Sequence, residues 1–415
     1  MSPAYSYPGT WAGRLRIALF CLVFFVPGPL GLIGFTGWSG FVENRPLASF
    51  PWSVLEAGKL DATAKGIDAF FSDHFAFRPL LIYAANRAKL LLNAASTPVV
   101  LLHDNNWVFY QDSFNGAPAT QPAEAVLLGK QHWMFLNDLT EYRGLTVTDP
   151  TAIDSWKETY SQRQRWSEGK GAHFLLVISP QKATVYPEYL PDYARVMGNE
   201  TRRGQFLGAA RGSGLHVLDL TAPLVAAKNA GQLYYKYDTH WNFRGAYFGA
   251  RAIINYLHSR FAAVPAFSDQ DWMVSDLPNQ IYTFQDEHEG WYNLGVRIGV
   301  PFLKDADARV ERRGGWTTQL KVTTRRRHMN VYTFTKDNPT LPSVVFYADS
   351  FGYPLKQIIA EHFRQAIFVN PFEDERTLAD EFPADIIDEA RPDYVIYLRW
   401  EHAAFAPADN PPDLR

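Results

Sequence analysis

The feature that most constrains the fold of this chain is a series of short apolar segments separated by helical patterns. Phe174–Ser179, Ser343–Ala348 and Tyr394–Leu398 contain no charged residue, and weaker segments lie at Leu215–Leu220 and Ala366–Val369. A strand that is apolar at every position is typical of a sheet that is covered on both faces. Strands that alternate with helices indicate βαβ units and a parallel sheet. We therefore expect an α/β fold with a mainly parallel sheet.

Helix boundaries are also marked in the sequence. Asp149 followed by Pro150 is typical of an N-cap residue with proline at the first helical position. Gly169 marks the expected end of that helix. Further helices are predicted over Gly245–Ser259 and over residues 350–363.

The stretch from about 264 to 340 breaks the alternation of strands and helices. It contains Arg312-Arg313-Gly314-Gly315, which is followed by the segment TTQLKVTTRRRHMNVYTFT. Two glycines between alternating segments predict a β-hairpin. We expect this stretch to be a β-rich insertion beside the functional site.

The N-terminal region is predicted to contact a membrane. Arg14 and Arg16 precede an uncharged stretch, residues 17–42, whose first half reads IALFCLVFFV. A helix needs roughly 20 apolar residues to span a bilayer, and basic residues before the span keep that end in the cytoplasm. We expect residues 1–16 in the cytoplasm, residues 17–38 as a transmembrane signal anchor, and the rest of the chain on the other side.

A second interpretation of the same region is a signal peptide that is removed. Pro27-Gly28-Pro29 interrupts the apolar stretch and is compatible with the end of such a peptide. No small-x-small cleavage site follows, so the uncleaved anchor is favoured. Residues 39–96 then form a connector that contains an apolar helix around Leu80–Leu92.

Composition excludes several classes of function. The net charge of −3 gives no reason to expect nucleic acid binding. Cys21 is the one cysteine, so the rest of the chain has no disulfide, thiol nucleophile or cysteine-based metal site. The chain is rich in aromatic residues, with 12 Trp, 21 Tyr and 29 Phe. Most of these rings are expected in the core, and some are candidate platforms for sugars, Trp241 among them.

Two short motifs about a hundred residues apart carry candidate chemistry. In the first, Asp238 and His240 lie two residues apart within YDTHWN. In the second, a buried strand ends in Asp349-Ser350 before a helix, which is how a nucleophilic hydroxyl is presented at the end of a sheet. Together these residues can form an Asp-His-Ser triad, which depends on geometry and not on chain order. The N–H groups of the helix after Ser350 could then form part of an oxyanion hole.

Each motif also has a purely structural interpretation. Asp349 or Ser350 could simply cap the following helix, and Asp238 could cap a polar turn that contains His240. The neighbours Asp73 and His74 show how readily such pairs arise. A metal site would need further ligands at suitable spacing, and the sequence offers none.

A basic group lies in the β-rich stretch. Arg325, Arg326 and Arg327 are followed by His328. They are compatible with a groove for an anionic polymer, or with the solvated face of a hairpin. The sequence contains no P-loop, no GxGxxG and no HExxH.

Taken in order, several segments resemble the alginate O-acetyltransferase family, which includes AlgJ and AlgX. These are ENRPLA, FFSDHFAFR, NNWVFY, DTHWN, the strand ending in ADSF, and PDYVIYLRWEH. The size and the expected N-terminal anchor make the chain more similar to AlgJ. The resemblance implies an SGNH-hydrolase-like α/β/α sandwich over residues 97–405, with residues 406–415 as a C-terminal tail.

The resemblance also implies roles for the motif residues. Asp238 takes the place of the family's carboxylate, His240 that of the base, and Ser350 that of the nucleophile. Ala348 stands where the family usually has glycine before Asp-Ser. The segment GWYNLGVRIGVP lacks the clear G-D-L run that carries an oxyanion donor in the family.

The activity implied is O-acetylation of an alginate-like exopolysaccharide in the bacterial periplasm through an acyl-serine intermediate. A membrane-bound O-acyltransferase would deliver the acetyl group, the N-terminal helix would lie in the inner membrane, and no cofactor is expected. Two alternatives stay open: an acetyl esterase with the same triad, and a non-catalytic polysaccharide-binding subunit of a secretion complex.

Overall fold

The structure is a computed structural model in which two compact units are described. The first unit is Met1–Pro98 with Asp286–Phe302, and the second is Val99–Gln285 with Leu303–Arg415. The described residues are 48–52, 60–74, 99–103, 106–110, 126–136, 139–145, 148–192, 194, 196–198, 200–281, 294–297, 304–326, 329–371, 382–405 and 407.

The first unit contains the helices α4 (Leu60–Asp73) and α12 (Leu294–Arg297). The strands of the second unit are β1 (Val99–His103), β2 (Asn106–Tyr110), β3 (Val126–Leu128), β4 (Met134–Leu136), β5 (His173–Ser179), β6 (Val217–Asp219), β7 (Trp272–Ile281), β8 (Lys304–Arg312), β9 (Gln319–Arg326), β10 (Met329–Thr335), β11 (Ser343–Ala348), β12 (Gln365–Pro371) and β13 (Tyr394–Trp400).

The α-helices of the second unit are α6 (Thr140–Arg143), α7 (Pro150–Gly169), α8 (Lys182–Val185), α9 (Arg202–Ala210), α10 (Thr221–Ala227), α11 (Phe243–Arg260), α13 (Lys356–Ala360), α14 (Ala384–Ala390) and α15 (Glu401–Ala404). Its 3₁₀ helices are η2 (Lys130–His132), η3 (Pro187–Tyr189), η4 (Lys228–Ala230), η5 (Asp269–Asp271) and η6 (Ser350–Leu355).

The second unit is built on a seven-stranded mixed sheet with the order β6-β5-β13-β11-β12-β10-β9. The strands from β6 to β12 pair in parallel, and β10 and β9 join antiparallel at one end. Two smaller antiparallel sheets accompany it, β2-β1-β3-β4 and the pair β7-β8. The expectation of an α/β fold with a mainly parallel sheet is confirmed.

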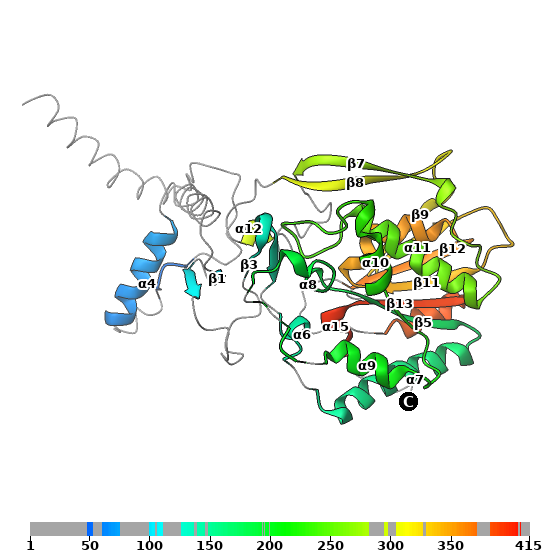
Figure 1. Ribbon diagram of the computed structural model, residues 1–415, viewed down its shortest axis with the longest axis horizontal. Coiled ribbons are helices and arrows are strands. Elements are labelled where there is room, and N and C mark those ends of the chain that lie inside the picture. Colours follow the sequence, from blue (N-terminus) through cyan, green and yellow to red (C-terminus); the bar gives the residue numbers. More distant parts are fainter. Residues whose placement is uncertain are drawn as a thin grey trace, which may run out of the picture. The chain divides into compact units, whose positions relative to one another are not determined.

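Helices cover both faces of the large sheet. In Figure 1, α7 and α9 lie on one side of the sheet, and α10 and α11 lie on the other. Successive side chains of a strand point to opposite faces, and β11 follows this rule. Its Val344 and Phe346 pack in the core on the α11 side, whereas Val345 and Tyr347 pack in the core on the α7 side. Both faces are therefore buried, which explains why the strands are apolar at every position.

The predicted elements agree with the structure at most positions. The strand Ser343–Ala348 has the expected bounds, and Asp149 caps α7 by accepting the Thr151 N–H at 2.8 Å. The helix expected over residues 350–363 is split into η6 and α13. Pro354 lies inside η6 and has no N–H to donate, so a regular α-helix cannot run through it.

The hairpin predicted around Gly314-Gly315 is wrong. The strands on either side of these glycines belong to different sheets, because β8 pairs with β7 and β9 pairs with β10. Both glycines have positive φ values, 81° and 84°, so they do turn the chain as glycine allows. The turn leads from one sheet to another, and β9 and β10 extend the large sheet.

The predicted membrane anchor, residues 17–38, lies outside the described residues, as does the helix around Leu80–Leu92. Within the part of the chain that the structure describes, no helix is long and apolar enough to cross a membrane.

Candidate active site

Ser350 lies at the carboxyl end of a central strand, where the chain turns from β11 into η6. The preceding Asp349 caps this helix, since its Oδ1 accepts the Phe351 N–H at 3.1 Å. Its Oδ2 accepts the N–H of Trp400, at the end of the neighbouring strand β13. Asp349 thus meets the capping requirement, and the hydroxyl of Ser350 is available for another partner.

That partner is His240. The Nε2 atom of His240 lies 2.8 Å from Ser350 Oγ, and its Nδ1 lies 2.7 Å from Asp238 Oδ1. The same carboxylate oxygen accepts the His240 backbone N–H at 2.8 Å. A proton on Nδ1 is therefore directed at the carboxylate, which leaves Nε2 to accept the serine O–H. The structure brings the three residues predicted for the triad into one hydrogen-bonded chain.

Burial differs along this chain. Asp238 and His240 are 2% and 1% exposed, whereas Ser350 is of intermediate exposure. A buried Asp–His pair is shielded from competing water, and the hydroxyl is the member that a substrate can reach. This is the arrangement that activates a serine nucleophile.

The loop that carries Asp238 and His240 is closed by backbone contacts. Tyr235 N–H donates to His240 C=O at 3.1 Å, and Asn242 N–H donates to Leu233 C=O at 2.9 Å. The Asn242 side chain then caps α11 by accepting the Gly245 N–H at 3.0 Å. The motif YDTHWN therefore encodes a tight loop together with the start of the next helix.

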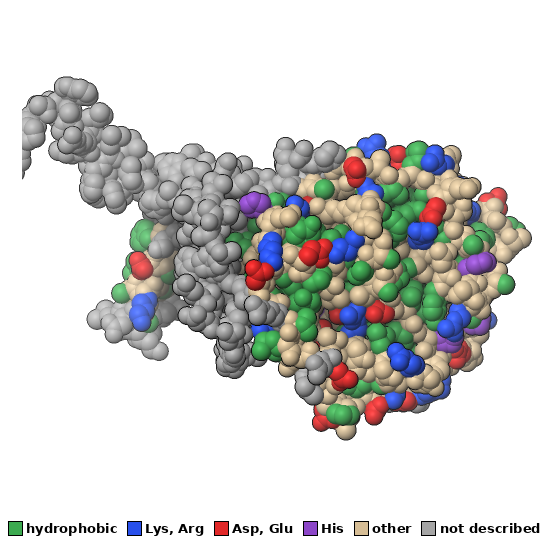
Figure 2. All heavy atoms as spheres, in the orientation of Figure 1, with side chains coloured by type: hydrophobic (Ala, Val, Ile, Leu, Met, Phe, Trp, Pro, Cys, Tyr) green, Lys and Arg blue, Asp and Glu red, His purple; other side chains and the backbone are tan. Residues whose placement is uncertain are grey.

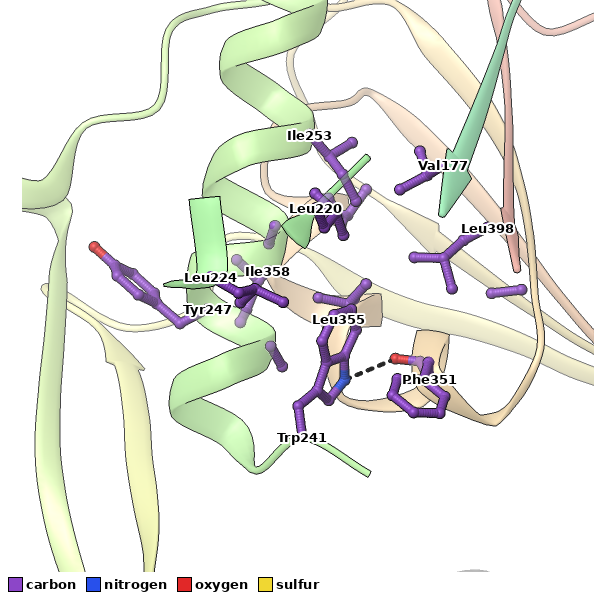
Figure 3. Close-up of a cluster of buried hydrophobic side chains, with 14 of the residues drawn as sticks. Val177, Leu220, Leu224, Trp241, Tyr247, Ile253, Phe351, Leu355, Ile358 and Leu398 are labelled. Atoms are coloured by element: carbon purple, nitrogen blue, oxygen red, sulfur yellow. Dashed lines mark hydrogen bonds between the residues drawn. The ribbon is translucent and has the colours of Figure 1, made fainter. Parts of the chain in front are cut away.

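Trp241 is part of the core and offers no exposed face for a sugar. It is 1% exposed, and its Nε1–H donates to the backbone carbonyl of Phe351 at 3.0 Å (Figure 3). The two rings meet edge to face, with centroids 5.2 Å apart. The bond joins the residue after the histidine to the residue after the serine, so it fixes the two motifs against each other.

The backbone donors expected for an oxyanion hole are partly occupied. The N–H groups of Phe351 and Gly352 donate to Asp349, to its carboxylate and its carbonyl respectively. Neither therefore points at a substrate, which corrects the expectation for these two groups. Asn370 donates to the carbonyls of Ala348 and Asp349 at 2.9 and 3.1 Å, and so fixes the backbone just before Ser350.

Two carboxylates that the sequence reasoning missed hold the histidine loop in place. Asp305 Oδ2 accepts the Tyr237 N–H at 3.1 Å, and Asp307 Oδ1 accepts the Phe243 N–H at 3.1 Å. Burial raises the pKa of both carboxyl groups. The sequence feature that could have indicated them is the run KDADAR at the start of β8. In this run Asp305 and Asp307 are two residues apart, so both side chains point to the same side of the strand.

The comparisons with known proteins bear on this site. Residues 126–277 match the family model described as the SGNH hydrolase-like domain of the acetyltransferase AlgX. A probable alginate O-acetylase AlgJ from Pseudomonas syringae pv. tomato is 30% identical over 128 residues, which cover 31% of this chain and 32% of that protein. The probable alginate O-acetylase AlgJ of Pseudomonas aeruginosa is 25% identical over 216 residues, covering 52% and 46%.

The chain resembles the alginate O-acetylases. The matched stretches span about a third to a half of the length of these curated relatives. Among solved structures, Bacillus cereus PatB1 with a sulfonyl adduct is similar with a TM-score of 0.50 at 11% identity, covering 69% of this chain and 99% of that chain. At this identity the likeness concerns the fold alone.

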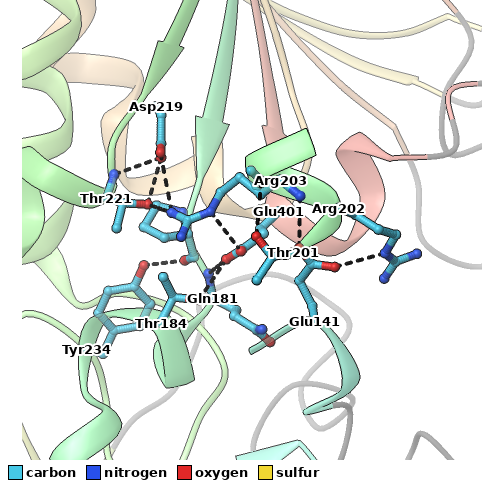
Figure 4. Close-up of polar contacts among 12 residues, drawn as sticks. Glu141, Gln181, Thr184, Thr201, Arg202, Arg203, Asp219, Thr221, Tyr234 and Glu401 are labelled. Atoms are coloured by element: carbon cyan, nitrogen blue, oxygen red, sulfur yellow. Dashed lines mark hydrogen bonds and ion pairs between the residues drawn. The ribbon is translucent and has the colours of Figure 1, made fainter. Parts of the chain in front are cut away.

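A buried polar network adjoins the carboxyl ends of β5, β6 and β13 in the second unit (Figure 4). Glu401 accepts the Gln181 N–H at 2.8 Å and the Thr184 hydroxyl at 3.0 Å, and it pairs with Arg203 at 3.3 Å. Arg203 also reaches Asp219 at 3.3 Å. Burial raises the pKa of Glu401 to about 7, against the opposing effect of the Arg203 guanidinium. The network joins the loops that follow three strands and so stiffens this edge of the sheet.

The predicted basic group is only partly described. Arg325 and Arg326 belong to β9, where they pair with Asn330 and Met329 of β10, and Arg327 lies outside the described residues. In the sheet order, β9 lies three strands from β11, roughly 14 Å at the usual strand spacing. On the face drawn in Figure 2, Lys and Arg side chains are interspersed with Asp and Glu.

In the other neighbouring pair named above, Asp73-His74, the structure describes a contact of the histidine. His74 directly follows α4, and its Nδ1 atom lies 2.9 Å from the carbonyl of Phe70 in the last turn of that helix. Among the described residues, no group of three His, Cys, Asp or Glu side chains is arranged to bind a metal ion.

Proposed function

We propose that this protein is an O-acetyltransferase that acetylates hydroxyl groups of an alginate-like exopolysaccharide. The observation that carries the proposal is the hydrogen-bonded chain from Asp238 through His240 to the partly exposed Ser350. The similarity to probable alginate O-acetylases supports the choice of acetyl transfer and of a polysaccharide acceptor.

In the first half of the reaction, His240 Nε2 takes the proton of the Ser350 hydroxyl as Oγ attacks the acetyl carbonyl carbon of a donor. The donor's leaving group departs with the proton that His240 has gained. Asp238 keeps the proton on Nδ1 and stabilises the imidazolium that forms between these steps. The product is an acetyl ester on Ser350.

In the second half, a sugar hydroxyl takes the position of the leaving group. His240 accepts its proton as the sugar oxygen attacks the acetyl carbon, and Ser350 leaves with that proton returned to Oγ. For both tetrahedral intermediates we propose the Ser350 N–H as an oxyanion donor, because Asp349 occupies the next two N–H groups.

The setting of the reaction is part of the proposal. The domain would work in the bacterial periplasm, attached to the inner membrane by residues 17–38. Because no soluble pool of acetyl-coenzyme A is expected there, a membrane-bound O-acyltransferase would supply the acetyl group. We expect the reaction to need no cofactor.

Intact mass spectrometry of the full chain after incubation with p-nitrophenyl acetate tests the acyl-serine step. The expected result is a single acetyl adduct on Ser350 that is absent in Ser350→Ala and in His240→Ala. His74→Ala is the matched control, since it removes the histidine of another Asp-His neighbour pair and should leave the adduct unchanged.

Added acceptor then separates the possible functions. Ester gained by a mannuronate oligosaccharide, with loss of the adduct, supports transfer. Release of acetate that oligosaccharide does not intercept supports the esterase alternative. A folded wild type that never forms the adduct contradicts both and favours a non-catalytic, polysaccharide-binding role.

A further inference from the structure

Lys182 is a buried cation that the proposed reaction does not use. It is the first residue of the short helix α8 and is 4% exposed. Its ammonium lies 5.2 Å from the ring centre of Phe135 and 5.8 Å from that of Trp133. Burying a lysine side chain costs free energy unless the charge is paired or fully hydrogen-bonded. The hydrogen bonds of this ammonium must therefore offset that cost.

The Lys182 ammonium donates hydrogen bonds to the loop that carries Asp238 and His240. The Nζ atom donates to the backbone carbonyls of Tyr235, Lys236 and Asp238, at 2.9, 3.0 and 2.6 Å. An ammonium has three N–H donors and no acceptor. The three donors therefore match three carbonyls, one of which belongs to the residue whose side chain orients His240.

The charges around Lys182 favour its protonated form and oppose the effect of burial. Burial lowers the pKa of Lys182 to about 7, while the carboxylates of Asp238 and Asp305 raise it. Asp305 lies on β8 and binds the same loop as Lys182, since its carboxylate accepts the Tyr237 N–H. Among its other neighbours, Lys236 is cationic and lies 5.9 Å from the Trp133 ring centre, and Tyr235 bonds Asp307.

We propose that Lys182 is a positioning residue of the triad, whose ammonium gathers three loop carbonyls so that the Asp238 carboxylate meets His240 Nδ1. The proposal rests on the proposed function, because it assigns to Lys182 a part in activating Ser350. Lys182 touches neither the serine nor the substrate. It acts through the backbone of Asp238.

This role depends on protonation. A neutral amine has two N–H donors and one lone pair, so one of the three carbonyls would face the lone pair and be repelled. The loop should therefore loosen when Lys182 loses its proton. Activation of Ser350 should fall as the pH rises through the titration of Lys182.

The first test compares the full-length wild type with Lys182→Met across pH 5.5–9.5, using the rate of Ser350 acetylation by p-nitrophenyl acetate. The wild type should show a descending limb between about pH 7 and 8.5. The variant should acylate at least tenfold more slowly at pH 6.5, with little change in KM, and should lack the descending limb. Equal rates and equal pH profiles in the two proteins would overturn the proposal.

Lys228→Met is the matched control. Lys228 donates to the carbonyl of Val185, at the other end of the same short helix, and pairs with Glu188. Its loss removes a lysine–carbonyl bond of α8 without touching the triad loop. A control that slows acylation as much as Lys182→Met would show a general effect of α8, and it too would overturn the proposal.

A second measurement does not need catalysis, and its wild-type part needs no variant. The downfield proton resonance of His240 Nδ1–H reports its hydrogen bond to Asp238 directly. In the wild type it should be sharp at pH 6 and weaken by pH 9, and in a folded Lys182→Met it should be absent or shifted at both. A wild-type resonance that stays unchanged from pH 6 to 9 contradicts the positioning role.

The two measurements also separate this proposal from the proposed function. If wild-type Ser350 is never acylated, the acetyltransferase assignment fails, and the resonance still decides the role of Lys182. If acylation proceeds but neither the pH profile nor the resonance depends on Lys182, the assignment stands and the positioning role fails.

Discussion

At the residue scale, the turn from β11 into η6 divides two tasks between neighbouring residues. Asp349 caps the helix and binds the end of β13, so the hydroxyl of Ser350 is free to meet His240. The sequence presented capping and catalysis as alternatives for these two residues. In the structure Asp349 caps the helix, and Ser350 lies within hydrogen-bonding distance of His240.

Replacement of Asp238 with Asn should stop the activation of Ser350 without unfolding the protein. Asp238 Oδ1 accepts both the His240 backbone N–H and Nδ1–H, and an amide in its place carries no negative charge. The imidazolium that forms when His240 takes the serine proton would therefore lose its stabilising charge. We expect acylation of Ser350 to fall about a thousandfold or more, measured as the burst of p-nitrophenol, with an unchanged circular dichroism spectrum. A loss below tenfold contradicts the orienting role.

Ala348, which stands where the related family usually has glycine, sets a condition on Gly352. A Cβ at residue 352 would overlap the Ala348 Cβ and lie 3.3 Å from the Phe346 ring. Gly352→Ala should therefore lower the free energy of unfolding by about 1–3 kcal/mol, as overpacking does. The double variant with Ala348→Gly should recover part of this loss, because it removes the clashing methyl group. Urea denaturation of the two single variants and the double variant measures the coupling, and purely additive losses would disprove the contact.

At the element scale, the strand β8 positions the loop that carries Asp238 and His240. Asp305 and Asp307 bind backbone N–H groups on either side of the motif YDTHWN. The alternating stretch of residues 264–340 predicted strands, and strands were found there. Which strand would pair with which was not predictable, because pairing depends on contacts far apart in the chain. The glycine turn was recognised, but its partner strands were assigned wrongly.

Removal of Asp305 should destabilise the site and the fold together. Asp305 is 4% exposed and accepts bonds from Gln232, Tyr237 and Ala306. Asp305→Ala leaves the Tyr237 N–H without its acceptor and takes a counter-charge from Lys182. We expect a loss of about 3 kcal/mol or more in the free energy of unfolding by urea.

Asp276→Ala on the partner strand β7 is the control for that variant. Asp276 pairs with Arg244, but its side chain is 84% exposed. The Arg244 side chain is 9% exposed but keeps its bond to the Ala230 carbonyl, so loss of the exposed Asp276 should cost only about 1 kcal/mol. Equal losses of stability in the two variants would show that any change to the β7-β8 pair destabilises the protein, and that the buried carboxylate of Asp305 has no special effect.

At the scale of the whole molecule, buried ionisable groups make stability depend on pH. His362 follows α13, is 8% exposed, and stacks on Phe267 with ring centroids 5.3 Å apart. Within the described part of the chain its Nε2 has no hydrogen-bond partner. Burial, helped by the cations Lys336 and Arg312, lowers the pKa of His362 to about 4. The folded protein therefore holds this imidazole neutral where the unfolded chain would protonate it.

The consequence is acid sensitivity. Between about pH 6.5 and pH 4 the unfolded state binds the proton and the folded state does not, so stability falls as the pH is lowered. The contribution of this group amounts to at most about 3 kcal/mol. His362→Gln should flatten the pH dependence in this window when unfolding by urea is followed from pH 7 to pH 4. A variant with the wild-type slope would contradict the assignment to His362.

The sequence by itself determined the α/β class and the buried strands, and it singled out Asp238, His240 and Ser350, which the structure brings together. These follow from local signals: an apolar strand encodes its own burial on two faces, and the motifs YDTHWN and ADSF encode a tight loop and a capped turn. Only the tertiary structure decided that Trp241 lies in the core, that β9 and β10 extend the large sheet, and that Lys182 and Asp305 hydrogen-bond the loop of Asp238 and His240. The physical reason is that the role of a buried charge or ring depends on the residues it contacts, and these can be far away in the sequence. Lys182 is more than fifty residues from the carbonyls it binds, and Asp305 is 68 residues from Tyr237, so no local pattern records either contact.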